Sequence, residues 1–125
     1  MIDREGLVAA SRDLGDRGRA WLRAGLGDHQ NVGEIRGRGL LMAVELVSDR
    51  DTKAPFDRSD GIAELIVEAA FDRRLTVYPC GSAVDGNVGD AVLLGPPLSV
   101  SADELHTMIE RLIDAVRAVL PTSAA

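Results

Sequence analysis

The sequence is poor in several residues that carry chemistry, and each shortage excludes a class of protein. Its single cysteine, Cys80, cannot form a disulfide within the chain, and no set of cysteines and histidines has the spacing of a zinc site. Aromatic residues make up only 3% of the chain. No apolar run approaches the roughly 20 residues that a membrane-spanning helix needs. We therefore expect no disulfide framework, no metal site and no membrane partner.

Positive charge is also scarce, because 14 lysines and arginines face 20 acidic residues and leave a net charge of −6. Nucleic acids are bound by clustered positive charge that meets the phosphates. Arg17, Arg19 and Arg23 lie close together, but aspartates surround them, so we interpret this segment as the solvated face of a helix. No nucleic-acid partner is expected.

Lysine occurs once, as Lys53 in the polar segment SDRDTKAPF. A lysine that forms a Schiff base must lose its proton, and desolvation of the amine favours that loss. The acids and polar residues around Lys53 favour the charged amine instead. The chain is therefore predicted to offer no Schiff-base lysine.

The remaining composition is that of one globular domain. The chain has 125 residues, and 46% of them are hydrophobic, which is enough to bury an aliphatic core. The N-terminal segment MIDREGLVAASRD carries acids early and has no long apolar centre, unlike a secretory signal peptide. We expect a single cytoplasmic domain over residues 1–125.

Apolar periodicity and turn residues predict the elements of the first half. A helix is expected over about residues 5–26, weakened by Gly15 and Gly18. Its apolar positions are Leu7, Leu14, Trp21, Leu22 and Leu26. A short strand around Val32 and Ile35 and a longer one over residues 40–46 follow, joined by the glycines of RGRG in a β-hairpin.

A second helix has its apolar stripe at Ile62, Leu65, Ile66, Ala69 and Ala70. Ser59 or Asp60 is the expected N-cap of this helix. The segment LTVYP predicts a short strand that Pro79 stops, and a glycine-rich loop leads to another strand at residues 91–94.

The third helix is expected to begin at Ser101, because Ser101 and Glu104 have the spacing of a capping box. Pro121 ends it, and residues 121–125 form a frayed tail. Its apolar stripe is Leu105, Met108, Ile109, Leu112, Ile113, Val116 and Leu120. The order of elements predicts an α+β domain with a small, largely antiparallel sheet covered by helices.

No residue stands out as catalytic. Cys80 has no histidine near it in the sequence, and His106 is interpreted as a surface residue on the third helix. Asp85 and Asp90 flank glycines, as turn residues do, and no regular set of oxygen ligands follows them. The segment GRGLLM lacks a third glycine and precedes a strand, so it is not a dinucleotide-binding loop.

Two segments resemble a known family. VGEIRGRGLLMAVELV is similar to the hairpin near the start of the small C-terminal domain of class III aminotransferases, which depend on pyridoxal phosphate. GDAVLLGPPLSVSADEL is similar to that family's closing strand, Pro-Pro corner and last helix, and GIAELIVEAAFDRRLTVYPCG to the helix and strand between them. The resemblance covers about residues 5–120.

The resemblance implies an α+β small domain of a fold-type I enzyme whose large catalytic domain is absent. In complete members that large domain carries the Schiff-base lysine and the cofactor contacts. The implied partner is thus the missing large domain or a dimer partner, with pyridoxal phosphate held only in the complete enzyme. Its substrates would be amines or amino acids and 2-oxo acids, and the chain alone is expected to be inactive.

The resemblance also implies roles for individual positions. In some amine transaminases an arginine matching Tyr78 holds a substrate carboxylate, and in ornithine-type members an arginine matching Leu93 does so. Neither arginine is present, so Tyr78 is a candidate for an amine-binding pocket or for simple packing. The Arg-Gly pattern and the Pro-Pro corner are expected to be structural, at Arg36, Gly37, Gly39, Pro96 and Pro97.

The alternative is a stand-alone α+β binding or interaction module, derived from this domain and without catalysis. A polar, monomeric surface with its own closed pocket would favour that module. An exposed apolar patch would favour a domain that docks on a larger partner.

Overall fold

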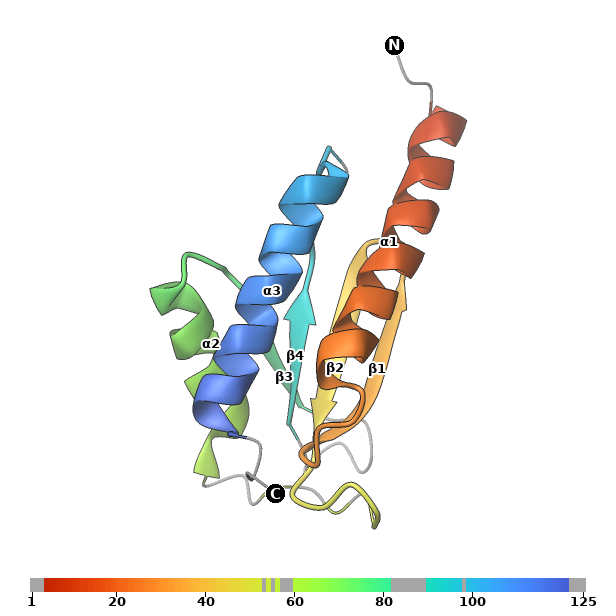
Figure 1. Cartoon of the computed structure of the whole chain (residues 1–125). Helices are drawn as coiled ribbons and strands as arrows, with labels where there is room; N and C mark the ends of the chain where they lie inside the picture. The colour runs from red at the N-terminus through yellow and green to blue at the C-terminus, as the bar shows by residue number, and fades with distance from the viewer. Residues whose placement is uncertain are drawn as a thin grey trace.

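A computed structural model describes residues 4–52, 54, 56, 60–81, 90–97 and 99–121, and for residues 4–8, 80–81 and 90 it describes the backbone alone (Figure 1). The seven elements follow the predicted order of helix, two strands, helix, two strands and helix. They are α1 (Arg4–Leu26), β1 (Val32–Arg38), β2 (Leu41–Leu46), α2 (Ile62–Asp72), β3 (Tyr78–Gly81), β4 (Asp90–Leu94) and α3 (Ala102–Val119).

The four strands form one sheet in the order β1-β2-β4-β3. Every neighbouring pair is antiparallel. The prediction of an α+β fold with a small antiparallel sheet is therefore confirmed.

One face of the sheet carries the core. Alternate residues of β2 and β4, such as Val44 and Val92, are fully buried, as expected when one face of a strand packs inward. They belong to the same cluster as Leu22 of α1, Ile66 of α2 and Leu105 of α3. All three helices thus cover the same face, with α1 and α3 lying in front of the sheet in Figure 1.

The predicted hairpin joins β1 to β2 through a two-residue loop, because Arg38 lies opposite Leu41. Gly39 is the first loop residue and has a φ of 56°, which glycine adopts without the steric cost of a Cβ. Gly37 lies within β1 instead. Only one of the two glycines in RGRG therefore supplies the positive φ.

Helix α1 lies unusually close to this hairpin. A Cβ on Gly15 would stand 1.7 Å from the carbonyl oxygen of Gly39, and one on Gly18 would stand 2.5 Å from the methyl carbon of Met42. The glycines that lower the intrinsic helix propensity of α1 are thus what allow the close approach.

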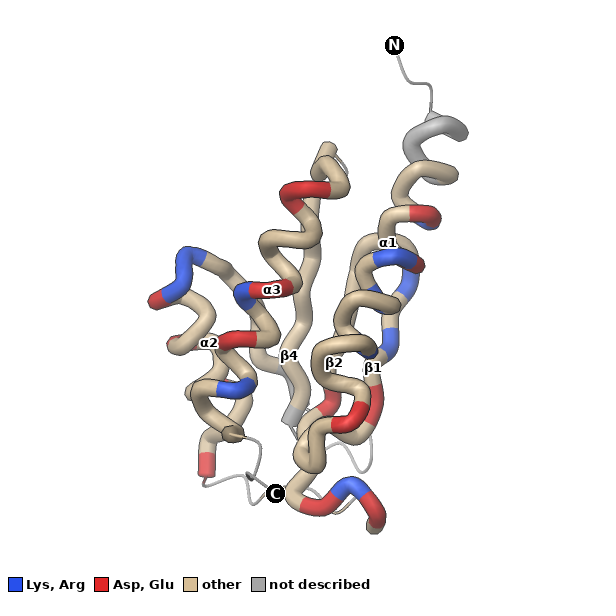
Figure 2. Tube along the Cα trace, in the orientation of Figure 1, with Lys and Arg blue, Asp and Glu red and all other residues tan. Residues whose placement is uncertain are grey.

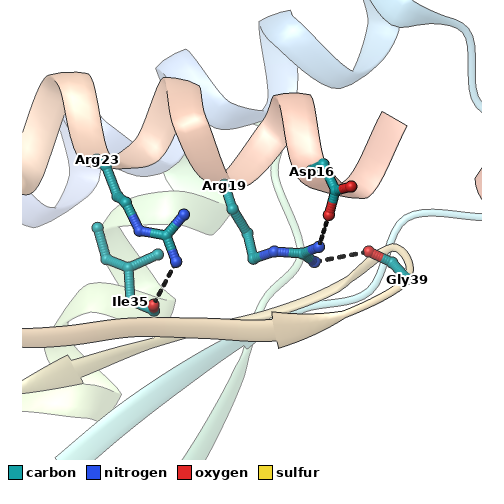
Figure 3. A network of polar contacts seen from close by, with 5 residues as sticks. All are labelled: Asp16, Arg19, Arg23, Ile35 and Gly39. Atoms are coloured by element: carbon teal, nitrogen blue, oxygen red, sulfur yellow. Dashed lines mark hydrogen bonds and ion pairs between the residues drawn. The ribbon is translucent and has the colours of Figure 1, made fainter. Parts of the chain in front are cut away.

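Arg19 of α1 departs from the prediction of a solvated helix face. Arg19 is only 9% exposed, and its guanidinium donates hydrogen bonds to the Gly39 carbonyl, at 2.8 Å, and to the Asp16 carboxylate. Arg23 donates to the Ile35 carbonyl at 3.1 Å. Figure 3 shows both side chains reaching from α1 to the hairpin. The prediction was wrong for Arg19, because its hydrogen bonds to the turn carbonyl and to Asp16 offset the cost of burying the guanidinium. Arg17 and Arg23 are exposed, as predicted.

Helix α2 also departs from the prediction at two points. Its N-cap is Gly61, with a φ of 57° and no side-chain cap, rather than Ser59 or Asp60. Leu65 is 46% exposed, whereas Ala63 is buried in its place. The stripe is rotated because α2 packs on both α3 and the β3–β4 end of the sheet.

Strand β3 begins at Tyr78 and continues past Pro79, although we expected the proline to stop it. Proline lacks a backbone N–H, so it is tolerated in a strand that has a neighbour on one side only. The sheet order gives β3 such an edge position.

Helix α3 confirms its predicted start. The Ser101 side chain accepts from the Glu104 backbone N–H, and Glu104 accepts from the Ser101 N–H, which completes the capping box. Met108 and Ile113 are only partly buried, whereas Ala115 joins the buried stripe.

His29 ties the far end of α3 to the loop after α1. Its Nδ1 accepts a hydrogen bond from the Asn31 backbone N–H at 3.0 Å, and its Nε2 lies 2.6 Å from the Leu120 carbonyl oxygen. Because Nδ1 is an acceptor, Nε2 carries the proton and donates it to that carbonyl. This buried histidine is a structural link between the two ends of the fold.

Candidate functional site

The face of the sheet opposite the helices brings the predicted site residues together. Arg36 lies opposite Ala43, Ala43 opposite Leu93, and Leu93 opposite Tyr78. Residues directly opposite in an antiparallel sheet point to the same face. The two positions singled out by the family resemblance, Tyr78 and Leu93, are therefore neighbours on one surface.

A second row lies beside the first, at the hairpin end of the sheet. Arg38 is opposite Leu41, and the Leu41 side chain reaches over Gly95, ending 3.9 Å from where a Cβ of that glycine would be. We call these two rows the open patch. Its residues are Arg36, Arg38, Leu41, Ala43, Tyr78 and Leu93.

The open patch exposes large hydrophobic side chains, whereas polar residues are usual on the solvent-facing side of a sheet. Tyr78 is 60% exposed and Leu41 is 51% exposed. Ala43 and Leu93 between them are partly buried. The other end of the same face differs, because Ala91 is buried there.

The two arginines of the patch lie on β1, where Figure 2 shows basic residues in blue beside α1, and only one of them is paired with an acid among the described residues. Arg36 is paired across the strands with Glu45, with 3.4 Å between its guanidinium nitrogen and the carboxylate oxygen. Arg38 is exposed, and its guanidinium has no partner within the described part of the chain. The hydrogen bond to the hairpin turn comes from Arg19, whose guanidinium donates to the Gly39 carbonyl. No short sequence motif indicated this role for Arg19.

The Pro-Pro corner lies between the patch and α3. Pro96 is buried and Pro97 is exposed, and the Pro97 carbonyl accepts a hydrogen bond from the Val100 N–H at 3.0 Å. This turn leads directly to the N-cap of α3 at Ser101. Pro96 and Pro97 direct the chain from β4 toward α3, and neither carries a charged group.

The two histidines do not belong to the patch. His29 is buried in the loop after α1, and His106 lies on α3, where its ring meets Trp21 edge-on and its Nδ1 is 3.5 Å from Glu110. His106 is half-exposed, as predicted for a surface residue. Asp85 and Lys53 lie outside the described residues, as does the side chain of Cys80.

The described residues form neither a metal-binding cluster nor a membrane-spanning helix. Within the same residues, no group of three or more histidine, cysteine, aspartate or glutamate side chains is placed to hold a metal. Nor is any described helix both long and apolar enough to span a membrane. The exposed apolar side chains of the open patch, Leu41 and Tyr78, are suited to contact with another molecule or domain.

Comparison with known proteins matches this chain to aminotransferases. The family model "Aminotransferase class-III" matches residues 1–116. The uncharacterized aminotransferase YodT of Bacillus subtilis is 41% identical over 88 residues, covering 70% of this chain and 20% of its own length. The hypotaurine/taurine–pyruvate aminotransferase of Paracoccus denitrificans is 30% identical over 123 residues, covering 93% of this chain and 24% of that protein.

A solved structure agrees with these matches in three dimensions. The PLP-bound crystal structure of a mutant aminotransferase from Vibrio fluvialis superposes with a TM-score of 0.80 at 30% identity. The match covers 93% of this chain and 24% of that protein. The chain thus spans about a quarter or less of the length of these relatives, and with the family match over residues 1–116 it belongs to the class III aminotransferases.

Proposed function

We propose that this chain is the C-terminal small domain of a class III aminotransferase and acts in amino-group transfer only together with a large, lysine-bearing domain. The observation that carries this proposal is the family match over residues 1–116, combined with the small share, 20–24%, of the length of similar aminotransferases that the chain covers. The small domain is proposed to be a single unit over about residues 5–120, in a cytoplasmic enzyme.

The proposed cofactor of the complete enzyme is pyridoxal phosphate. The similar aminotransferase from Vibrio fluvialis has this cofactor bound, which supports the proposal. Its chemistry, when bound, is to stabilise negative charge on the carbon that exchanges the amino group. This chain contributes shape and polarity beside that centre.

A chimera tests the proposed function. The matching segment of the Paracoccus denitrificans aminotransferase is replaced by this chain, and alanine formation from pyruvate is measured with hypotaurine or taurine as donor. We expect the chimera to transfer the amino group, whereas the isolated chain mixed with pyridoxal phosphate does not. A folded, cofactor-loaded chimera without activity, or turnover by the isolated chain, contradicts the proposal.

Tyr78 is proposed to line the amine-binding pocket of that complete enzyme. Its side chain is 60% exposed and lies beside Leu93, so the two positions present a phenol and an aliphatic chain. The family resemblance implies an arginine at one of these positions in members that hold a substrate carboxylate. A neutral pair here favours donors whose substituent carries no carboxylate.

Exchanging Tyr78 in the chimera tests this preference. Tyr78→Arg is expected to raise kcat/KM for a carboxylate-bearing donor by about tenfold or more relative to a simple amine, since a charge-assisted hydrogen bond contributes about 1.5–3 kcal/mol. Tyr78→Phe should leave the preference unchanged. Phe71→Arg, on the exposed side of α2, is the matched control. An equal response of the Tyr78→Arg and Phe71→Arg variants would exclude Tyr78 from the pocket.

A further inference from the structure

We propose that His29 is an acid-released latch, a buried neutral histidine that holds the end of α3 against the loop after α1 until its ring takes up a second proton. This inference concerns the conformation of the chain and does not depend on the proposed function. The ends of α1 and α3 lie at the same end of the molecule (Figure 1). His29 is 4% exposed there, and both of its ring nitrogens make hydrogen bonds.

The two ring nitrogens of His29 have opposite roles. Nδ1 accepts a hydrogen bond from the Asn31 backbone N–H at 3.0 Å, and Nε2 lies 2.6 Å from the Leu120 carbonyl oxygen. A neutral imidazole has one acceptor and one donor nitrogen, so it satisfies both partners. An imidazolium has two donors, and its Nδ1–H would point at the Asn31 N–H. The neutral ring is therefore the form that fits this position.

A second proton would bring no compensating bond at the other nitrogen. Nε2 already donates to the Leu120 carbonyl in the neutral ring, so protonation adds no hydrogen bond there. The carbonyl end of a helix does attract a positive charge. This attraction is smaller than the cost of placing an unpaired charge in a buried position, to which the lost hydrogen bond at Nδ1 is added.

The charged side chains on the surrounding elements do not pair with the ring. They are Arg23 of α1, Asp28 of the same loop, Arg50 after β2 and Arg117 of α3. Arg23 and Arg117 donate to the backbone carbonyls of Ile35 and Gly25. The Asp28 carboxylate is fully exposed and faces Arg50 across 3.9 Å. Among the described residues no carboxylate forms an ion pair with His29, so an imidazolium would lack a counter-charge.

The latch connects three segments of the chain. Asn31 receives the ring on one side, and on the other its Nδ2 donates to the carbonyls of Val47 and Ser48, at 3.0 and 3.3 Å. Arg117 adds a second link between α3 and the end of α1, through the Gly25 carbonyl at 2.8 Å. Release of the ring should therefore loosen the loop after α1 and the last turn of α3 together.

The direction of the pH dependence follows from the neutral ring. A histidine in solvent gains its second proton near about pH 6.5, so the released state takes up this proton as the pH falls, whereas the latched state does not. The latch is thus fully effective above that pH and is weakened below it. Between about pH 7.5 and about pH 5, release should become up to about 30-fold more favourable, which is the limit for one ordinary imidazole.

Amide hydrogen exchange of the full chain, followed by NMR, tests the latch. The protection factor of the Asn31 amide is compared at about pH 7.5 and about pH 5, after correction for the intrinsic effect of pH on exchange. We expect it to fall by about ten- to 30-fold. At about pH 5 the carboxylate of the capping box is still charged, because the pKa of Glu104 is lowered below 4.5, so its loss does not contribute.

The chain has two histidines, which provides a matched pair of variants. His29→Gln can still donate to the Leu120 carbonyl but does not titrate, so its Asn31 protection should not fall between the two pH values. His106→Gln alters the half-exposed histidine of α3 and should retain the full decrease. An equal decrease in His29→Gln overturns the inference, as does loss of the decrease in His106→Gln.

The unchanged chain keeps the proposal testable even if His29→Gln does not fold. Nitrogen NMR of its imidazole at about pH 7.5 should show the proton on Nε2 and none on Nδ1. A proton on Nδ1 overturns the inference. Equal Asn31 protection of the unchanged chain at the two pH values overturns it as well.

Discussion

Arg19 joins helix α1 to the hairpin turn through one guanidinium, and the stability of this contact can be measured. Arg19→Met keeps the buried aliphatic stem but leaves the Gly39 carbonyl without its described side-chain donor. We expect a loss of about 1–3 kcal/mol in the free energy of unfolding, measured by urea denaturation. Arg12→Met, at an exposed position on the same helix, should change it by less than about 0.5 kcal/mol. Equal effects of the two substitutions would show that Arg19 is not a structural residue.

Arg74 has a conformation that its side chain does not favour. It follows the end of α2 with a φ of 62°, in a Schellman motif in which the Leu75 N–H bonds to the Ala70 carbonyl and the Arg74 N–H to the Phe71 carbonyl. Arg74→Gly removes the Cβ and is expected to stabilise the fold by about 0.5–1 kcal/mol, by thermal or urea denaturation. Arg74→Ala retains the Cβ and should give no such gain. A lower free energy of unfolding for Arg74→Gly than for the unchanged chain would show that the Arg74 backbone is not strained.

At the scale of elements, the capping box makes the start of α3 sensitive to acid. Two hydrogen bonds lower the pKa of Glu104 below its ordinary value of 4.5. The larger effect comes from the Ser101 backbone N–H and the smaller one from the Ser101 side chain. A carboxyl group with a lower pKa in the folded state stabilises the fold above its unfolded pKa, and this stabilisation is lost as the pH falls through the folded pKa.

The matched variant is Glu104→Gln, which keeps an acceptor oxygen but does not titrate. The chain should exceed this variant in stability near pH 7, and the difference should shrink below about pH 4.5. Urea denaturation of both proteins at several pH values measures it. A difference that does not depend on pH would mean that the Glu104 charge makes no contribution.

The sequence predicted elements with strong local signals and failed where tertiary contacts decide. The order of the helices and strands, the hairpin and the capping box of α3 all follow from periodicity and turn chemistry. Arg19 was missed because its role depends on a carbonyl 20 residues away. One signal was available, since Arg19 shares the helical register of Leu22 and Leu26 and follows Gly15 by one turn.

The candidate site was predictable only in part, for a similar reason. Family resemblance indicated Tyr78 and Leu93 separately, but only strand pairing places them side by side. Leu41 was assigned to an apolar strand, and its exposure depends on which face of β2 the helices cover. Alternation along a strand divides its side chains between two faces, but the sequence alone does not show which face the helices pack against.

At the scale of the whole molecule, one core connects all three helices with the sheet, so the isolated chain should unfold in one step. Trp21, the only tryptophan, packs against this core between α1 and α3 and reports on their contact. Thermal transitions followed by Trp21 fluorescence and by far-ultraviolet circular dichroism should coincide. A separate, earlier fluorescence transition would show that α1 detaches while the rest of the fold persists.

The contact between Arg23 and Ile35 has a consequence for solubility. In a hairpin closed by Arg38 and Leu41, the carbonyl of Ile35 points away from β2, at the outer edge of the sheet. Unpaired groups at such an edge can recruit a strand from another chain and begin fibril growth. Arg23 occupies that carbonyl, and at the opposite edge Pro79 has no N–H to offer. Both borders of the sheet therefore resist growth into a ribbon, even while one of its faces stays exposed.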